Sequence, residues 1–250
     1  WRTILRLAGG DAHALFGLAG LIVGVGVGVI FFRNGFSLGR SQHLNRFSGL
    51  LMPALMLGLV CLYLVDPPIP GQPKNGVLFY SLKGPGSMHA PFILSLAAGL
   101  IVGFFAQRSR FCTMGALRDV MLFRQFHLAM GFAAMLVAAL VLNIFFGSFH
   151  WGFENQPVAQ PNDLWNFLGM VTCGLAFALA GGCPGRQLFL SGEGDNDAAV
   201  FIMGLIVGAA MCHNFGLASS TAGIGIHGAL ATIAGFVVCL FIGFFNCKRA

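Results

Sequence analysis

Charged side chains are scarce in this 250-residue chain, and their scarcity excludes most water-soluble folds. Only 9% of the residues are charged, whereas 57% are hydrophobic, and the mean hydropathy is +0.82. So few charges cannot cover the surface of a soluble globule of this length. The chain is therefore expected to use the lipid bilayer as its solvent.

The sequence also shows no metal-site spacing, no disulfide framework and no cleavable signal. No cysteine spacing is typical of zinc ligands, and the seven cysteines are an odd number placed mostly within apolar runs. The opening residues show no basic region ahead of an apolar one with a small-residue cleavage site. Neither a metal nor another cofactor is expected.

Long apolar runs are what the sequence has in abundance. The runs lie at 12–33, 47–65, 91–106, 126–147, 165–182, 198–217 and 227–245. Each is about the length that a hydrocarbon core of roughly 30 Å demands of a helix, although the run at 91–106 is short and either tilts little or continues into Gln107 and Arg108. The sequence predicts an all-α integral membrane protein with about seven transmembrane helices and further short broken or re-entrant helices.

Basic residues gather on one side of these predicted spans. Ten of the 14 lysines and arginines follow the first, third, fifth and seventh spans. By the positive-inside rule that side is cytoplasmic, and so is the C-terminus of a multi-pass protein of the inner (plasma) membrane. The formal net charge of +6 then reflects topology, and no nucleic-acid partner is expected.

Two segments separated by 184 positions share an unusual set of residues. The identical pairs are Arg2/Arg186, Gly10/Gly194, Asp11/Asp195, Ala14/Ala198 and the run 20–24 over 204–208. Charged and glycine positions in register rarely match by chance. By the count of spans the two copies run in opposite directions, which predicts an inverted-topology repeat with a central site, the plan of secondary transporters.

The repeat predicts how the membrane domain is divided. Residues 91–250 form a second repeat half with both cysteine motifs, and residues 1–90 form the C-terminal part of a first half. Because copy one begins without the cysteine segments that precede copy two, the repeat unit is expected to extend upstream by roughly 90 to 100 residues.

Two interrupted segments place a cysteine beside a turn. Cys112 stands between a basic cluster that includes Arg110 and a small-residue turn that begins with Thr113. Cys183 lies between Gly182 and Pro184, after an apolar run. Proline disfavours helical geometry at the residue before it, and glycine permits unusual backbone angles.

Such breaks have two interpretations. Broken helices at membrane depth are tolerated where they line a cavity, and their free N–H groups attract anions. Alternatively, they are ordinary turns that each hold a buried cysteine, since free cysteine is among the most buried residue types. Of the other cysteines, Cys212 is the best further candidate for the path, because it ends a span just before His213 and a turn.

A second pair of turns follows the two copies. Residues 34–41, with Ser37, have a counterpart at 213–220, with Gly216. Their small and hydroxyl residues suit re-entrant turns that offer N–H and O–H donors, and a plain interfacial loop is the alternative.

Acidic residues near the starts of the copies are predicted to cap helices. Asp11 and Asp195 each precede a span, where a carboxylate accepts N–H bonds and favours the helix dipole. Arg186 is expected either to pair with the nearby acids, among them Glu193, Asp195 and Asp197, or to hold an anion at the mouth of the path.

The cysteine motifs resemble those of the YeeE/YedE sulfur-transport family. The resemblance lies in Arg-Ser-Arg-Phe-Cys-x-x-Gly-Ala-x-Arg-Asp at 108–119 and in Gly-Gly-Cys-Pro-x-Arg from residue 181. The second motif, with the segments 84–91 and 213–220, is more similar to the YedE branch, which is named for selenium metabolism. The resemblance implies an inverted-repeat importer of thiosulfate-like anions in which central thiols hand the anion along, and only Cys112 and Cys183 match the family's cysteines.

The function expected from these residues and the resemblance is a permease for a small sulfur- or selenium-containing anion. Neutral thiols at Cys112 and Cys183 and the Thr113 hydroxyl replace part of the anion's water, whereas a thiolate would repel it. Besides the anion and membrane lipid, the resemblance implies a cytosolic sulfurtransferase similar to TusA or YedF as a partner. A thiol-dependent chalcogen transferase and a structural membrane subunit stay open as alternatives.

Overall fold

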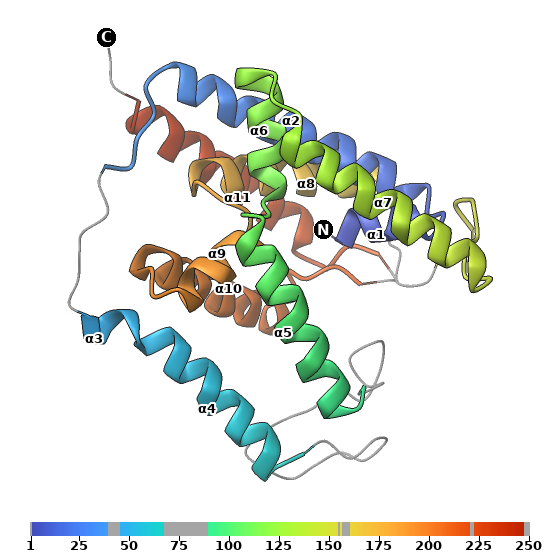
Figure 1. Cartoon of the computed structure of the whole chain (residues 1–250). Helices are drawn as coiled ribbons and strands as arrows, with labels where there is room; N and C mark the ends of the chain where they lie inside the picture. The colour runs from blue at the N-terminus through green and yellow to red at the C-terminus, as the bar shows by residue number, and fades with distance from the viewer. Residues whose placement is uncertain are drawn as a thin grey trace. The chain divides into compact units, whose positions relative to one another are not determined.

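The computed structural model describes residues 2–39, 46–67, 90–154, 156, 161–220 and 223–247 (Figure 1). The chain divides into two compact units, one of Trp1–Arg40, Cys112–Gly185 and Met203–Ala250, the other of Ser41–Phe111 and Arg186–Ile202. Most of the predicted motif at 84–91, and Arg40 and Ser41 of the predicted turn at 34–41, lie outside the described residues.

The described elements are helices, joined by turns that contain a few isolated β-bridges. The first unit holds α1 (Arg2–Ala8), α2 (His13–Arg33), α6 (Thr113–Phe123), α7 (His127–Phe145), α8 (Asp163–Leu179), most of α10 (Asn196–Asn214) and α11 (Gly228–Phe245). The second holds α3 (Arg46–Gly49), α4 (Leu51–Val65), α5 (Phe92–Arg108), most of α9 (Pro184–Gly192) and the start of α10.

Seven helical stretches in the described part are long and apolar enough to cross a membrane, which confirms the predicted number of spans. Two of them are bent. The stretch Phe92–Phe123 is α5 followed by α6, and Asp163–Gly192 is α8 followed by α9. The short run at 91–106 continues as a helix to Arg108. Helix α1 is a short helix that precedes the first span and was not predicted.

Small residues bring α2 and α8 into backbone contact. A Cβ on Gly20 or Gly24 would collide with the carbonyl oxygen of Phe167 or Val171, and one on Gly28 with the Ala178 side chain. From α8, a Cβ on Gly174 would lie 2.6 Å from the carbonyl oxygen of Leu21. Close approach through small residues is how helices associate where lipid removes the hydrophobic driving force. The two helices lie side by side and run in the same direction (Figure 1).

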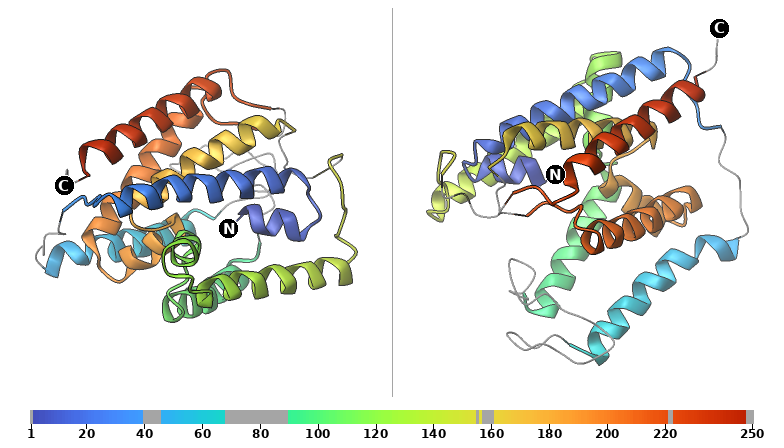
Figure 2. Two further views of the ribbon diagram at one scale, coloured as in Figure 1. Left: turned by 90° about the horizontal axis from the view of Figure 1, so that it is seen from above. Right: turned by 180° about the vertical axis from the view of Figure 1, so that it is seen from behind.

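Helix α11 runs alongside this pair in the same direction (Figure 2). Its Gly235 lies against Thr172 of α8, and Gly243 near its end lies against Phe31 near the end of α2. The segment after α7 instead returns to the start of α2, where Gly152 N–H donates to the Gly10 carbonyl at 3.1 Å. Helix α7 therefore runs opposite to α2, α8 and α11. This agrees with the predicted order of spans, because the fourth span crosses in the opposite direction to the first, fifth and seventh.

The repeated Gly-Asp turns have the same local structure in both copies. Gly10 and Gly194 both have a φ of +93°, in the region that favours glycine. Asp11 N–H donates to the Arg6 carbonyl at 3.1 Å, and Asp195 N–H donates to the equivalent Leu190 carbonyl at 3.0 Å. The carboxylates then accept backbone N–H bonds from His13 and Ala198, so the predicted capping role of Asp11 and Asp195 is confirmed.

Candidate functional site

Each of the two predicted cysteines stands at the N-terminus of a short helix. Cys112 precedes α6 in an extended conformation, and its sulfur accepts the N–H of Gly115 at 3.2 Å. A Cβ on Gly115 would lie 3.4 Å from that sulfur, so the glycine of the Cys-x-x-Gly motif allows the close approach. Cys183 precedes Pro184, which opens α9 in the first helical position, where a missing N–H costs nothing.

The fold brings these two distant cysteines together. Both belong to one buried cluster with Leu21, Val25, Val29, Met114 and Ala178, and each is 7% exposed. The thiol and the backbone N–H of Cys183 lie within hydrogen-bonding reach of the Cys112 sulfur. Two backbone N–H groups, of Gly115 and Cys183, therefore point at the Cys112 sulfur, whose own S–H can donate to the Cys183 sulfur.

The surroundings of the thiol pair are apolar and rich in sulfur. Met114 is 1% exposed in the cluster, and Met121 and Met170 pack against it with Phe32 and Phe177. The cluster members named among the described residues carry no formal charge. The site thus combines weak, polarisable donors with N–H groups, which suits brief contact with a large anion better than tight capture.

The glycines before Cys183 close the end of α8, and Gly181 has the unusual backbone angle that was expected of a glycine here. Gly181 has a φ of +75°, and its N–H donates to the Ala178 carbonyl at 3.0 Å. The N–H of Gly182 donates to the Phe177 carbonyl at 3.1 Å. These bonds close the last turn of α8, as in a Schellman motif, so the N–H of Gly182 is hydrogen-bonded within the chain. Thr113 and Pro184 are half-buried beside the thiols, as the first residues of α6 and α9.

The second pair of turns does not join the thiol cluster. Ser37 is exposed, and its hydroxyl oxygen accepts the Gly39 N–H at 3.2 Å. Gly216 is an exposed glycine with a φ of +65°, and its carbonyl accepts the His227 N–H at 3.3 Å. Both residues lie in exposed turns and are not members of the thiol cluster.

The remaining predicted residues are not members of the thiol cluster. Cys212 is half-buried and His213 is exposed at the end of α10. Arg186, near the start of α9, pairs with Glu193 just after its end at 3.9 Å, in agreement with one of its two predicted roles. Arg110 is exposed in the turn between α5 and α6, with a φ of +52°.

A group of ionisable residues at the start of α2 and α8 was not among the predicted site residues. His13 and Asp163 form an ion pair there, next to Arg6 and Asp11. The available signal was the second copy, in which Asp197 takes the place of His13. A histidine at the start of an otherwise apolar span, at a position where the repeats differ, is unusual enough to draw attention.

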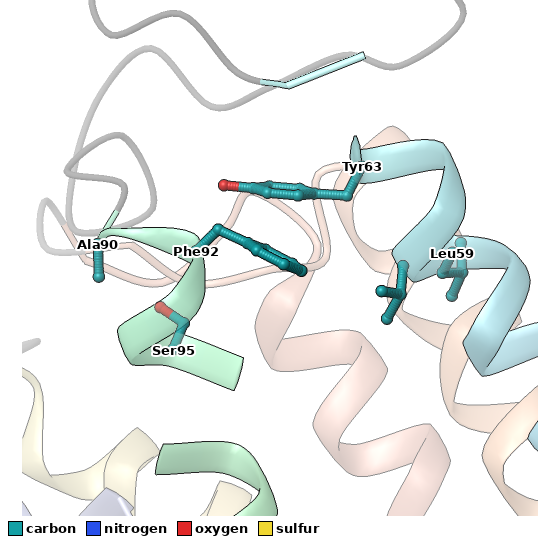
Figure 3. A pocket seen from close by; sticks show the side chains of 6 residues that line it. Leu59, Tyr63, Ala90, Phe92 and Ser95 are labelled. Carbon is teal, nitrogen blue, oxygen red and sulfur yellow. The ribbon is translucent and has the colours of Figure 1, made fainter. Parts of the chain in front are cut away.

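An open hollow of about 390 Å³ lies between α4 and the start of α5. Figure 3 shows the ring of Tyr63 stacked on that of Phe92, with Ser95 and Leu59 nearby, and the two ring centroids are 5.2 Å apart. Its lining is almost entirely apolar, and none of the predicted path residues contributes to it.

The fold and the thiol pair define a multi-pass helical membrane protein with a buried sulfur-lined centre. The profile of the sulphur transport family matches residues 108–245, more than half of the chain and the part that contains both cysteines. The chain therefore belongs to the sulphur transport family.

Two relatives carry the name thiosulfate transporter TsuA. The protein of Spirochaeta thermophila is 32% identical over 99 residues, which are 40% of this chain and 29% of the relative. The protein of Escherichia coli is 30% identical over 108 residues, which are 43% of this chain and 30% of the relative. The matches thus cover less than a third of either relative, and no solved structure gives a significant match.

Proposed function

We propose that this protein is a permease for a small sulfur oxyanion of the thiosulfate class and that the anion passes the Cys112–Cys183 thiol pair. The observation that carries the proposal is the meeting of these thiols, from separate bent spans, at the N-termini of two short helices. Membership of the sulphur transport family and the names of the two relatives support the choice of substrate.

The chemistry of the pair fits transient binding of a dianion. A divalent anion cannot enter the bilayer without partners, because burying unpaired charge costs several kcal/mol even after relaxation. The N–H groups of Gly115 and Cys183, which now face the Cys112 sulfur, can turn to the anion together with the neutral S–H donors. Because fixed cations are absent from the named cluster, the anion is held weakly enough to leave.

The structure corresponds to a closed path in this proposal. Each cysteine is only 7% exposed, so the thiols have to separate before an anion reaches them. The breaks at 109–112 and 180–183 are the natural places for this movement, since the helices on either side are separate elements. Burial also favours passage over a thiol enzyme, whose cysteine would have to meet a soluble carrier.

We also propose an organisation, a wider substrate class and a partner for the whole membrane protein. The chain would be organised as two inverted repeat halves, with residues 1–90 in the first and 91–250 in the second, and with a cytoplasmic C-terminus. The matching hydrogen bonds of the two Gly-Asp turns support the repeat. A selenium-containing anion is included in the substrate class through the resemblance to the YedE branch, and a TusA- or YedF-like sulfurtransferase is proposed as the cytosolic acceptor.

The proposed function is tested by measuring thiosulfate uptake in cells that express this protein and have no thiosulfate transporter of their own. We expect Cys112→Ala and Cys183→Ala to lower uptake of ³⁵S-thiosulfate at least tenfold, and the corresponding serine variants to retain more activity because a hydroxyl still donates. Cys61→Ala, on the exposed surface of α4, is the matched control and should leave uptake unchanged. Full uptake by both alanine variants at equal expression would rule the thiol path out, and parallel assays with selenite and selenosulfate define the substrate range.

A further inference from the structure

Four ionisable side chains gather where α2 and α8 begin. Arg6 of α1 pairs with Asp11, and the other oxygen of Asp11 accepts the His13 backbone N–H at 3.0 Å. Asp11 is 3% exposed and His13 is 6% exposed. Buried ionisable groups are expensive in a membrane protein unless they pair or take part in function. This cluster is separate from the thiols, which lie beside the later turns of α2 and beyond the end of α8.

The ring of His13 faces a hydrogen-bond acceptor on each side. Its Nε2 lies 3.0 Å from the Phe153 carbonyl oxygen, and its Nδ1 lies 2.6 Å from the Asp163 carboxylate. A carbonyl only accepts, so Nε2 carries a hydrogen. The short contact to Asp163 needs a second proton between Nδ1 and the carboxylate oxygen, because two lone pairs at that distance repel.

From this geometry we infer that His13 and Asp163 form a proton-binding site that holds the start of α2 to the start of α8. With the proton bound, the pair is neutral overall, and the charges of Arg6 and Asp11 cancel beside it. When the proton leaves, the Nδ1 lone pair faces an ionised carboxylate and the 2.6 Å contact cannot persist. The ligand of this site is therefore a single proton.

The groups that face His13 come from each element packed against it. Asp163 faces it from α8, the Phe153 carbonyl and ring edge from the loop after α7, and Asp11 from the turn after α1. Arg6 faces Asp11 and not the imidazole. His150 and Glu154, the other titratable groups on the loop, are exposed.

The site is connected mechanically to the thiol pair. Helices α2 and α8 touch through their backbones at Gly20, Gly24 and Gly174, and interiors packed this closely transmit displacement. Helix α8 leads directly to Cys183 at its other end. Proton release at His13 would thus loosen the contact between the starts of α2 and α8. Because the thiols lie toward the other ends of these two helices, proton occupancy would regulate passage of the anion. This last step rests on the proposed function, whereas the proton site does not.

Thermal unfolding of the purified chain from about pH 5 to about pH 9, the range in which imidazole groups titrate, tests the proton site. Because the contact exists only with the proton bound, the stability that it contributes is lost as the pH rises. We expect the melting temperature of the wild type to fall by about 3 °C or more across this range. His13→Gln should be less stable than wild type at the acid end and should lose most of the pH dependence.

Two further variants keep the test decisive. His127→Gln is the matched control, because His127 is also the first residue of its helix but is exposed, and it should follow the wild-type curve. Asp163→Asn removes the carboxylate and should flatten the curve in the same way, which covers the case that His13→Gln fails to fold. An unchanged pH dependence in Asp163→Asn or in a folded His13→Gln protein would overturn the inference.

Uptake assays separate this inference from the proposed function. We expect thiosulfate uptake by the wild type to change with external pH, and uptake by His13→Gln to be nearly constant. If the cysteine variants lose uptake while His13→Gln keeps the wild-type pH profile, the regulatory role fails and the permease stands. If the unfolding curves depend on His13 but no variant or wild-type chain transports thiosulfate, the proton site stands and the permease fails.

Discussion

The two copies of the repeated segment have the same turn and different surroundings. In both copies a glycine at a φ of +93° and a capping aspartate join a short helix to a long one. In the first copy the long helix, α2, buries Gly20 and Gly24 against α8, whereas in the second copy the equivalent Gly204 is exposed and Gly208 has no atom within 4 Å of a Cβ position. Local sequence therefore determines the structure of the turn. Whether the glycines of the following helix are buried depends on the neighbouring helix.

The side chains around the two turns also differ, since those of the first copy are more deeply buried. In the first copy Asp11 is buried and paired with Arg6, and His13 binds Asp163. In the second copy Leu190 and Asp197 occupy the positions of Arg6 and His13, and Asp195 is exposed. The two turns thus share their backbone geometry, and among the described residues the buried ionisable network surrounds the first turn.

The largest difference between the copies should appear on filling the glycine contact. Gly24→Leu places a side chain against the Val171 carbonyl, so α2 and α8 have to separate, and we expect a loss of more than about 3 kcal/mol and little folded protein. Gly208→Leu, its counterpart in open space, should stay within about 0.5 kcal/mol of wild type. Size-exclusion chromatography after a heat series measures both, and equal stability of the two variants would contradict the packing.

A smaller difference is expected at the turns themselves. Alanine at Gly10 or Gly194 is strained by about 1–3 kcal/mol, because both positions have a positive φ. At Gly10 the new Cβ would also lie 2.5 Å from the His150 carbonyl oxygen, whereas at Gly194 the nearest atom is the Gly49 carbonyl oxygen at 3.2 Å. Gly10→Ala should therefore lower the melting temperature more than Gly194→Ala, and the reverse order would show that the loop after α7 does not pack on this turn.

Removal of the capping carboxylates should give the next effect in size. Asp195→Ala loses one N–H bond at an exposed cap and should cost about 1 kcal/mol. Asp11→Ala also leaves Arg6 without its acid in a largely buried place and should cost about 2–3 kcal/mol. Chemical or thermal unfolding in detergent compares the two, with Asp195→Asn and Asp11→Asn as variants that keep an oxygen acceptor.

The smallest effect is expected at the partly exposed ion pair of the second copy. Arg186 and Glu193 are 3.9 Å apart, and the Glu193 side chain is 39% exposed. Such a pair contributes about 0–1 kcal/mol, so Glu193→Gln should hardly change the melting temperature. A loss as large as that of Asp11→Ala would mean that Arg186 depends on Glu193 for more than this weak contact, and thiosulfate uptake by the variant would then show whether transport needs it.

Much of the fold could be predicted because apolar runs and glycine patterns act locally. The seven spans, the breaks at Cys112 and Cys183, and the capping roles of Asp11 and Asp195 all follow from residues close together in the chain. The sequence did not indicate that the N–H of Gly182 closes the last turn of α8, because that bond depends on how the helix ends. The selenium branch, the division at residue 90 and the orientation of the C-terminus stay predictions.

What the sequence by itself determined is the solvent, the helices and the places where helices break, since each depends on hydrophobicity and backbone preferences within a few turns. Only the tertiary structure decided that Cys112 meets Cys183, and that His13 meets Asp163. The meeting of His13 and Asp163 results from the packing of α2 against α8 through small residues, and that of the cysteines also requires α6 to pack on these helices. The choice of helix partners depends on shape complementarity between segments far apart in the chain, and no local pattern contains it.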